Sequence, residues 1–485
     1  MIDLARLAGP IAGLGLAVLV VSRTRRNRIA GLGYAAVGGA LLVASLTSGH
    51  PLELAAVLVC GAVLAPLLAL LFRREPWLVA FGTLAFVPVR FGLLGHQLLV
   101  PLYTVALGAA ALLLWQLVDG DERARELGVF AWPLGLYVAW VGLSLGWAKD
   151  LHTGAIDVLA FYVPSTILAL AIARLPWDAL RARLLYAELA VMALVFACVG
   201  FYQYDTRTIF ENPKLQHDNR YTAIFRVNSV FWDPSIYGRF LVVALIATVV
   251  LIVLGRSRRV SLAGTGVVIV AWLGLLISFS QSSFAALLVG VIGVAWVAWR
   301  WRSLFAVGAA VIVLAGIAFS QPGIRHAVFH HTKSGLNSAS SGRYSLVSNG
   351  LRIAAKHPVT GVGIGGFAKA YSKRTHRPPR ASASHNTPVT VAAEGGAPGE
   401  LLYLWLVVAV LVAAARAYRR GPRRLLALSA GLALGAIFVH SLFYADFFED
   451  PMTWGLFGVI ALAAGVRAPA QEPVRPAEKK EPVPA

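Results

Sequence analysis

The chain has 485 residues, of which 58% are hydrophobic and only 14% are charged, and its formal net charge is +20. Soluble globular proteins are about 45–50% apolar and about 25% charged, so this composition excludes that class. A nucleic-acid-binding protein can be equally basic, but it does not carry so much unbroken apolar sequence. We therefore expect one polytopic membrane domain.

The apolar segments have the length of membrane-spanning helices. A bilayer core of about 30 Å needs roughly 17–25 helical residues, because no water is present there to satisfy backbone groups. The sequence predicts an all-α, polytopic integral membrane protein with about 12–15 transmembrane helices. About fifteen candidate segments start near Leu7, Ile29, Leu54, Trp77, Leu98, Val129, Ile156, Leu184, Ile236, Leu262, Phe284, Leu304, Glu400, Leu425 and Trp454.

The basic residues alternate between consecutive loops. Every second short loop is rich in arginine, and these loops together hold 21 basic residues, whereas the short loops between them hold only Lys149. Short cytoplasmic loops are enriched in Lys and Arg. The alternation predicts that residues 1–6 lie outside and the C-terminal tail inside. Two long loops, residues 205–235 and 320–399, are then outside.

Three regions follow from this pattern. We expect N-terminal transmembrane helices at residues 1–200, a transmembrane core with both outer loops at 201–468, and a disordered cytoplasmic tail at 469–485. The first apolar segment runs directly into an Arg-rich loop, so we expect it to remain as a span and not to be a cleaved signal peptide. Cys60 and Cys198 both fall inside predicted spans, and no disulfide follows from them.

The two outer loops differ in charge. The first carries four basic and four acidic residues, and its Asp233-Pro234-Ser235 predicts the start of a helix. The second carries ten Lys or Arg, six His and one acid, Glu394, which gives a net charge of about +9. A positive field of this size implies an anionic partner. Nucleic acid is not expected, because an aromatic stacking pattern is missing; lipid-linked phosphate or an acidic glycan fits better.

A helix is predicted inside the second outer loop. It opens at Gly342-Arg343-Tyr344 and ends at His357-Pro358, where proline stops it. Arg343 then lies in the first turn, where the helix dipole favours anions over cations. A bound phosphate would remove this mismatch, since the guanidinium and the helix N-terminus would face the same anion.

Glycine-rich sequence follows this helix, at residues 361–366 (GVGIGG). A dinucleotide-binding role is not expected, because no strand precedes the motif. We expect a tight turn in which the backbone approaches a lipid head group or another segment.

Four stretches, in this order, resemble the O-antigen ligase and O-antigen polymerase superfamily of bacterial membrane glycosyltransferases. They are residues 225–234 (FRVNSVFWDP), 341–367 (SGRYSLVSNGLRIAAKHPVTGVGIGGF), 384–399 (SHNTPVTVAAEGGAPG) and 441–458 (SLFYADFFEDPMTWGLFG). One position departs from the family pattern. Where the family commonly has Thr/Ser-x-Ser-Arg, this chain has Ser280-Gln281-Ser282-Ser283, so Ser283 replaces the arginine.

The resemblance implies transfer of a glycan from a polyprenyl-diphosphate donor to a hydroxyl of a lipid, glycan or protein acceptor, on the outer face of the bacterial cytoplasmic membrane. By motif position, Arg226 and Arg343 would bind the diphosphate, and His385 would act as general base or orient the acceptor. Each has a structural alternative. Arg226 could pair with Asp233, Arg343 could face solvent, and His385 could cap a turn.

Four further residues are predicted to bind substrate: Arg90, Arg239, Arg352 and Asn386. Arg90 and Arg239 lie within predicted spans, where an arginine is costly unless it has a function or reaches the interface. Arg352 shares the helix of Arg343, although charge on a helix is usually a solvated face. Asn386 belongs to the His-Asn motif.

No metal and no cofactor are expected. His326 and His330 have the spacing of metal ligands on a helix, but no acid lies near them in sequence. Asp119-Gly120-Asp121 mimics the motif of nucleotide-sugar transferases, yet it lies in a predicted cytoplasmic loop beside Arg123 and Arg125, where we expect solvated charge. The sequence therefore predicts metal-independent transfer.

The alternative function is transport, by a lipid-linked oligosaccharide flippase or another polysaccharide exporter. A flippase is expected to place charge along the spans that line its cavity, whereas here charge concentrates in the outer loops. A channel or purely structural membrane protein would leave the basic loop and its His-Asn motif unexplained.

Overall fold

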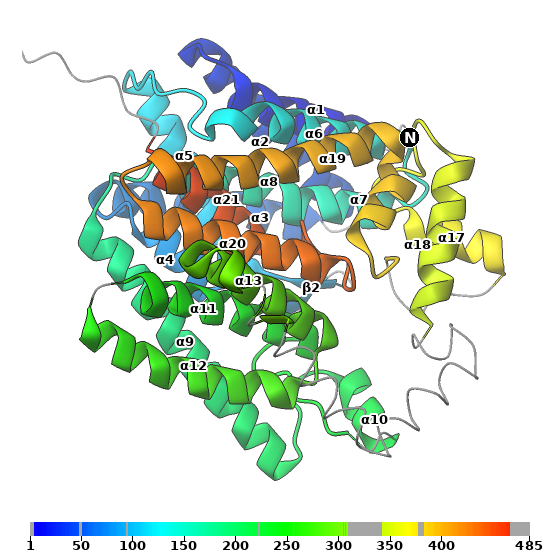
Figure 1. Cartoon of the computed structure of the whole chain (residues 1–485). Helices are drawn as coiled ribbons and strands as arrows, with labels where there is room; N and C mark the ends of the chain where they lie inside the picture. Colours follow the sequence, from blue (N-terminus) through cyan, green and yellow to red (C-terminus); the bar gives the residue numbers. More distant parts are fainter. Residues whose placement is uncertain are drawn as a thin grey trace, which may run out of the picture.

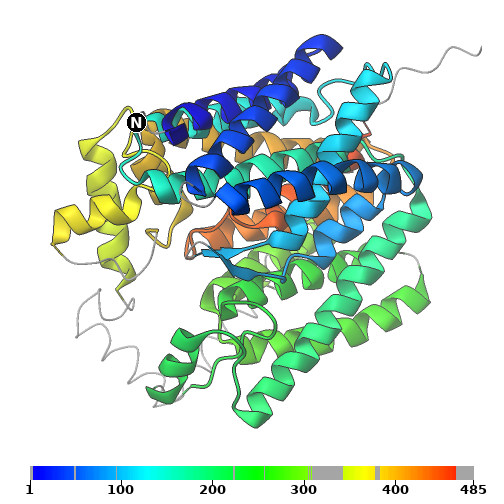
Figure 2. The ribbon, with the colours of Figure 1, turned by 180° about the vertical axis from the view of Figure 1, so that it is seen from behind.

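The structure is a computed structural model, and it describes residues 4–47, 51–93, 96–221, 224–255, 257–303, 305, 307–308, 342–376 and 383–465. Over these ranges the chain is helical apart from one two-stranded hairpin, and twelve helices are long and apolar enough to cross a membrane. The predicted all-α, polytopic architecture is confirmed. Figures 1 and 2 show the helices running side by side as one elongated bundle.

The bounds of the twelve long segments agree with most of the predicted starts. They are α1 (Leu4–Val21), α2 (Arg25–Leu46), α3 (Pro51–Arg74), α5 (Val100–Val118), the α6 segment (Gly128–Trp147), the α7–α8 segment (Leu151–Ala173), α9 (Ala179–Thr206), α11 (Pro234–Leu254), α12 (Arg258–Ser278), α13 (Gln281–Trp299), α19 (Thr387–Arg420) and α20 (Arg424–Ser441).

Two predicted spans form helices shorter than a usual membrane-spanning helix. The segment near Trp77 forms α4 (Leu78–Ala85), about 12 Å long, and the segment near Trp454 forms α21 (Pro451–Ala464), about 21 Å long. The segment predicted from Leu304 lies largely outside the described residues. The twelve long helices of the described ranges agree with the predicted number of about 12–15 spans.

Arg90 does not lie within a span, which corrects the prediction. Pro88 lacks an amide hydrogen and disfavours helix at the preceding residue, and α4 ends before it, at Ala85. Arg90 directly precedes β1 (Phe91–Leu93), which pairs antiparallel with β2 (His96–Leu98).

Glycines allow the first two helices to approach closely. A Cβ added at Gly15 would lie 2.5 Å from the backbone nitrogen of Ala35, and one at Gly38 would lie 2.5 Å from that of Ala12. In a bilayer, where lipid is as apolar as the side chains, such close packing replaces the hydrophobic effect as the force between helices.

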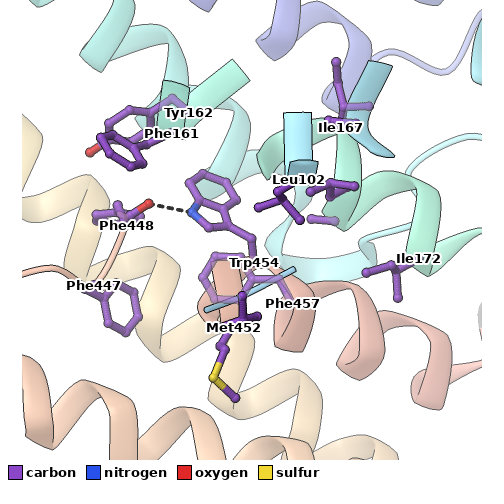
Figure 3. Close-up of a cluster of buried hydrophobic side chains, with 14 of the residues drawn as sticks. Leu102, Phe161, Tyr162, Ile167, Ile172, Phe447, Phe448, Met452, Trp454 and Phe457 are labelled. Carbon is purple, nitrogen blue, oxygen red and sulfur yellow. Dashed lines mark hydrogen bonds between the residues drawn. The ribbon is translucent and has the colours of Figure 1, made fainter. Parts of the chain in front are cut away.

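A buried aromatic cluster anchors the last short loop to the centre of the bundle (Figure 3). Trp454 of α21 is fully buried, and its indole Nε1 donates a hydrogen bond of 2.8 Å to the carbonyl oxygen of Phe448. The ring of Phe448 stacks on Tyr137 of α6 with 4.5 Å between centroids. The acidic residues of this loop are therefore held by the hydrophobic core.

The loops predicted to lie outside gather at one end of the bundle. The short helices α10 (Pro213–Tyr221), α17 (Arg343–Lys356) and α18 (Phe367–Thr375) lie at that end in both views (Figures 1 and 2). Backbone contacts tie these loops together: the amide of Lys149 donates to the carbonyl of Val362 at 3.0 Å.

An ion-pair network joins several of the loops predicted to lie inside. Arg28 pairs with Glu126 at 2.8 Å, and Arg174 pairs with both Glu126 and Asp121. Asp121 also pairs with Arg123 at 2.6 Å. The expectation of freely solvated charge at Asp119-Gly120-Asp121 was wrong for Asp121, because the fold places Arg174 against it.

Candidate functional site

Arg343 begins α17, as the sequence predicts. Gly342 has φ +86°, a left-handed conformation that glycine adopts readily, and the helix runs from Arg343 to Lys356. The side chains of Leu346 and Ile353, on the inner side of this helix, are buried. Arg343 is half-buried and makes no hydrogen bond or ion pair with any residue that the structure describes. The cationic side chain at the positive end of a helix is thus left free for an anion.

His385 lies two residues before the start of α19 and has φ +60°, an uncommon conformation for a residue other than glycine. Its neighbour Asn386 fixes this turn. The Asn386 side chain accepts a hydrogen bond of 3.0 Å from the amide of Val389 and donates one of 2.9 Å to the carbonyl of Leu442. These bonds favour a positioning role for Asn386 over its predicted substrate-binding role, which stays a prediction.

Arg343 lies close enough to His385 to influence its protonation. Burial lowers the pKa of the His385 imidazole, and the charge of Arg343 lowers it further, while Asp233 opposes both. Burial also lowers the pKa of Arg343, and the charge of Arg226 adds to this effect. Arg343 therefore lies within electrostatic range of His385 and of Arg226, the other two residues predicted to be catalytic.

Arg226 is held by its own loop. Asn219 accepts a hydrogen bond of 3.1 Å from the amide of Arg226 and donates one of 2.9 Å to its carbonyl. Within the described part of the chain, the guanidinium donates only through Nε, to the carbonyl of Ser278 at 3.3 Å. The alternative of an Arg226–Asp233 ion pair is not found between these two described residues. The Asp233 side chain instead accepts from the amide of Ser235 at 2.7 Å and caps α11, as predicted.

Arg239 is buried in an internal ion-pair cluster. Its side chain is 2% exposed, it pairs with Asp446, and its Nε lies 2.7 Å from a carboxylate oxygen of Asp450. This geometry gives the arginine two protein partners, so it favours a structural role and leaves the predicted substrate contact without support.

Arg352 lies away from Arg343 on the same helix. Nine residues separate them, which is about 180° around the helix axis and about 13.5 Å along it. Arg352 is exposed, and the two guanidiniums do not converge on one anion. Its predicted substrate-binding role finds no support in this geometry.

The serines at the start of α13 explain why arginine is replaced there. Ser280, Ser282 and Ser283 are buried, and the hydroxyl of Ser283 is 2.8 Å from that of Ser280. A Cβ added at Gly238 would lie only 2.5 Å from the Ser283 hydroxyl. The space that an arginine would need is therefore filled by α11.

The glycine-rich turn packs against protein. A Cβ at Gly361 would lie 2.2 Å from the carbonyl oxygen of Glu394, and one at Gly363 would lie 2.3 Å from the Cα of Ala148. The amide of Gly363 donates to the Glu394 carbonyl at 2.9 Å. Of the two expectations, approach to another segment is the one observed.

A cavity of about 710 Å³ lies beside this cluster. Tyr444 connects the two, because it lines the cavity and its ring also contacts that of His385, with 5.8 Å between centroids. Arg90 is half-buried in the wall. Four acids line the cavity, and no role was predicted for any of them from the sequence: Asp157, Glu394, Asp446 and Glu449.

Two of these acids belong to the last loop, outside the spans. Burial raises the pKa of Asp446 to about 6, although Arg239 opposes the shift. Glu449 is exposed, but partial desolvation in the cavity wall, with the charge of Asp446, raises its pKa to about 7. A signal for these residues was present in the sequence: Asp157 is an acid in an apolar segment, and Asp446 and Glu449 lie in a motif of the family resemblance.

The described ranges contain no group of three or more His, Cys, Asp or Glu side chains that could hold a metal ion. His326 and His330 lie outside those ranges. Metal independence stays a prediction.

Comparison with known families agrees with the sequence resemblance. The family model described as O-antigen ligase matches residues 266–404, a stretch that runs from α12 into α19 and contains Arg343 and His385. Arg226 precedes the matched stretch. No curated protein matches the chain.

Proposed function

Because residues 266–404 match the O-antigen ligase family model, we propose that this chain transfers a glycan from a polyprenyl-diphosphate carrier to an acceptor hydroxyl at the outer face of the bacterial cytoplasmic membrane. One observation carries the proposal. Arg343, at the start of α17, has no ion-pair partner among the described residues and lies within electrostatic range of Arg226 and His385.

The arginines would stabilise the diphosphate leaving group of this reaction. As the bond between the anomeric carbon and the diphosphate oxygen breaks, negative charge develops on the leaving group. A guanidinium stays charged and donates several hydrogen bonds in a geometry that suits phosphate. Arg343 and the N-terminus of α17 would meet one phosphate, and Arg226 would stabilise the same diphosphate from the other outer loop.

His385 would accept the proton of the acceptor hydroxyl. The acceptor oxygen bonds to the anomeric carbon and must lose its proton, which the imidazole would take. A base must be neutral to do so, and burial together with Arg343 keeps the pKa of His385 below its usual value. Asp233, which opposes that shift, would stabilise the imidazolium once it has formed.

The proposal requires no metal and no cofactor, since the arginines supply the positive charge. The donor would be the polyprenyl-diphosphate glycan, and the acceptor a lipid, a growing glycan or a protein. Nucleic acid is not a proposed partner.

A flippase or exporter is the second candidate. Asp157 and Glu394 lie in membrane-spanning segments and line a cavity, which is the arrangement expected of a transporter. Both lie near the ends of their segments at which the predicted outer loops gather, Asp157 about 9 Å from the start of its helix.

The test is transfer by the full chain, purified in lipid nanodiscs, from polyprenyl-diphosphate glycan to candidate acceptors. His385→Ala and Arg343→Ala should each abolish most of the transfer, and a chelator should not change it. Arg352→Ala, on the same helix as Arg343, is the matched control and should retain activity. Full activity of both site variants would contradict the assignment, and lipid translocation without a new glycosidic bond would support the flippase.

A further inference from the structure

The cavity beside His385 differs in chemistry from the cationic cluster. Its lining contains four carboxylates and one arginine, so its formal charge is opposite to that of the diphosphate cluster. A lipid diphosphate is therefore a poor ligand for this cavity, although the cavity adjoins the proposed reaction centre through Tyr444.

Two of the carboxylates lack a protein partner. Asp446 pairs with Arg239, and one oxygen of Glu394 accepts the amide of Phe367 at 3.1 Å. Asp157 and Glu449, in contrast, make no hydrogen bond or ion pair with any other residue that the structure describes. They are not grouped with a third ligand in a way that suits a metal ion.

A buried hydroxyl in the cavity wall also lacks a hydrogen-bond partner among the described residues. Thr387 is 4% exposed and lines the cavity, and its Oγ1 has no hydrogen-bond partner among the described residues. The buried Nε of Arg90 also has no hydrogen-bond partner among the described residues. Because buried polar groups are nearly always hydrogen-bonded, these two groups point to a polar ligand in the cavity.

Several aromatic rings also line the cavity. Trp140 and Trp232 line the cavity together with Tyr137, Tyr162 and Phe448, and the last two appear in Figure 3 on the side of the aromatic cluster. Apolar rings with a few placed polar groups are typical of small-molecule sites. A pyranose fits this lining: its C–H faces pack on aromatic rings, and its hydroxyls donate to carboxylates and exchange hydrogen bonds with a threonine hydroxyl.

We propose that this cavity is a carbohydrate subsite that takes a neutral or amino-substituted sugar ring and excludes an anionic one. Asp157, Glu449 and Thr387 hold its polar groups, Trp140 and Trp232 pack on its faces, and Tyr444 marks the side from which a sugar hydroxyl reaches His385. The inference rests on the proposed glycan transfer, for which it supplies the substrate class.

Binding without turnover tests the subsite by itself. The full chain in nanodiscs is titrated with tetrasaccharides of neutral hexoses, hexosamines and uronic acids, and tryptophan fluorescence is recorded, since Trp140 and Trp232 line the cavity. We expect saturable changes with hexoses or hexosamines and at least about tenfold weaker binding of the uronic acids. An Asp157→Asn, Glu449→Gln double variant should weaken binding at least about tenfold, and Thr387→Val should weaken it less.

The matched control is Glu188→Gln, which removes a half-buried carboxylate of α9 that does not line this cavity. Its fluorescence titration and thermal stability should equal those of the wild type. The double variant must keep the wild-type melting temperature. If it does not, the Asp157→Asn and Glu449→Gln single variants are titrated in its place. Tight binding of uronic acids, saturable binding by none of the sugars, or unchanged affinity in the variants would overturn the proposal.

Transfer kinetics separate the two sources of the sugar. If the cavity holds the acceptor, the carboxylate variants raise KM for the acceptor, and if it holds the donor glycan they raise KM for the donor. Sugar binding without any transfer would contradict the proposed function and leave the subsite standing. Transfer with unchanged KM values in these variants would contradict the subsite and leave the proposed function standing.

Discussion

His385 shows how single residues in this protein are set for a task by their surroundings. A left-handed backbone turn, the cap made by Asn386 and the ring of Tyr444 fix the imidazole between elements that are far apart in sequence. Burial and the charge of Arg343 favour its neutral form. Position and protonation state both suit a general base, and both depend on neighbours outside the His-Asn motif.

The pH dependence of transfer follows from this environment. Because the pKa of His385 is lowered, the neutral base is already present at neutral pH, so kcat/KM should rise with pH only below about 6.5 and then stay level. His385→Gln should lower the rate by about 10²–10⁴-fold and remove that rise. The measurement is kcat/KM from about pH 4.5 to about pH 8.

Two controls accompany this profile. His217, an exposed histidine of α10, should leave the profile unchanged when replaced by Gln. The pKa values of Asp446 and Glu449 are raised to about 6 and about 7, so these acids could also produce a rise in this range. The assignment to His385 therefore depends on loss of the rise in His385→Gln. A wild-type rise centred above pH 7, or one that persists in His385→Gln, would count against His385 as the base.

Among the helices and turns, local sequence signals predict where a helix starts, whereas contacts between distant segments set the position of the glycine-rich turn. The start of α17 at Arg343 and the start of α11 after Asp233 were predictable, because a glycine, a proline and a capping side chain act within a few residues. The place of the glycine-rich turn was not predictable in the same way, since Ala148, Gly154 and Glu394 come from distant segments.

Gly363 should tolerate no larger residue. Its φ is +82°, and a Cβ would lie 2.3 Å from the Cα of Ala148, so Gly363→Ala should cost at least about 1–3 kcal/mol from backbone strain alone. Thermal unfolding in detergent should show a lower Tm. Gly33→Ala in α2 is the matched control, because nothing lies within 4 Å of its added Cβ, and its Tm should stay equal or rise. Equal Tm values for wild type and Gly363→Ala would contradict the close approach.

At the scale of the whole molecule, the Arg239 cluster ties α11 to the loop before α21. Arg239→Leu leaves Asp446 and Asp450 buried without their cation, so we expect a loss of about 3–5 kcal/mol in the free energy of unfolding. Arg352→Leu, on an exposed surface, should change it by less than about 0.5 kcal/mol. Chemical unfolding in mixed micelles measures both. A raised KM with unchanged stability would restore the substrate-binding role predicted for Arg239.

The sidedness of the molecule can be tested by labelling. With Cys60→Ser and Cys198→Ser as background, Lys214→Cys should react with a membrane-impermeant maleimide on intact cells, and Arg258→Cys should react only after the cells are opened. Both positions are exposed, one at each end of the bundle. The opposite pattern would place the His385 cluster on the cytoplasmic face.

Hydrophobic length, the distribution of arginine and short motifs were enough to predict the membrane class, most of the spans, the grouping of loops at two ends and the resemblance to O-antigen ligases. The helices at α4 and α21 are shorter than the predicted spans, because Pro88 and the loop before Pro451 limit their length. Which charges have a partner depends on the tertiary structure. Arg239 and Arg343 look alike in sequence, but distant carboxylates neutralise Arg239, whereas Arg343 has no ion-pair partner among the residues that the structure describes. The acidic cavity, built from α7, α19 and the last loop, likewise exists only once those segments pack together.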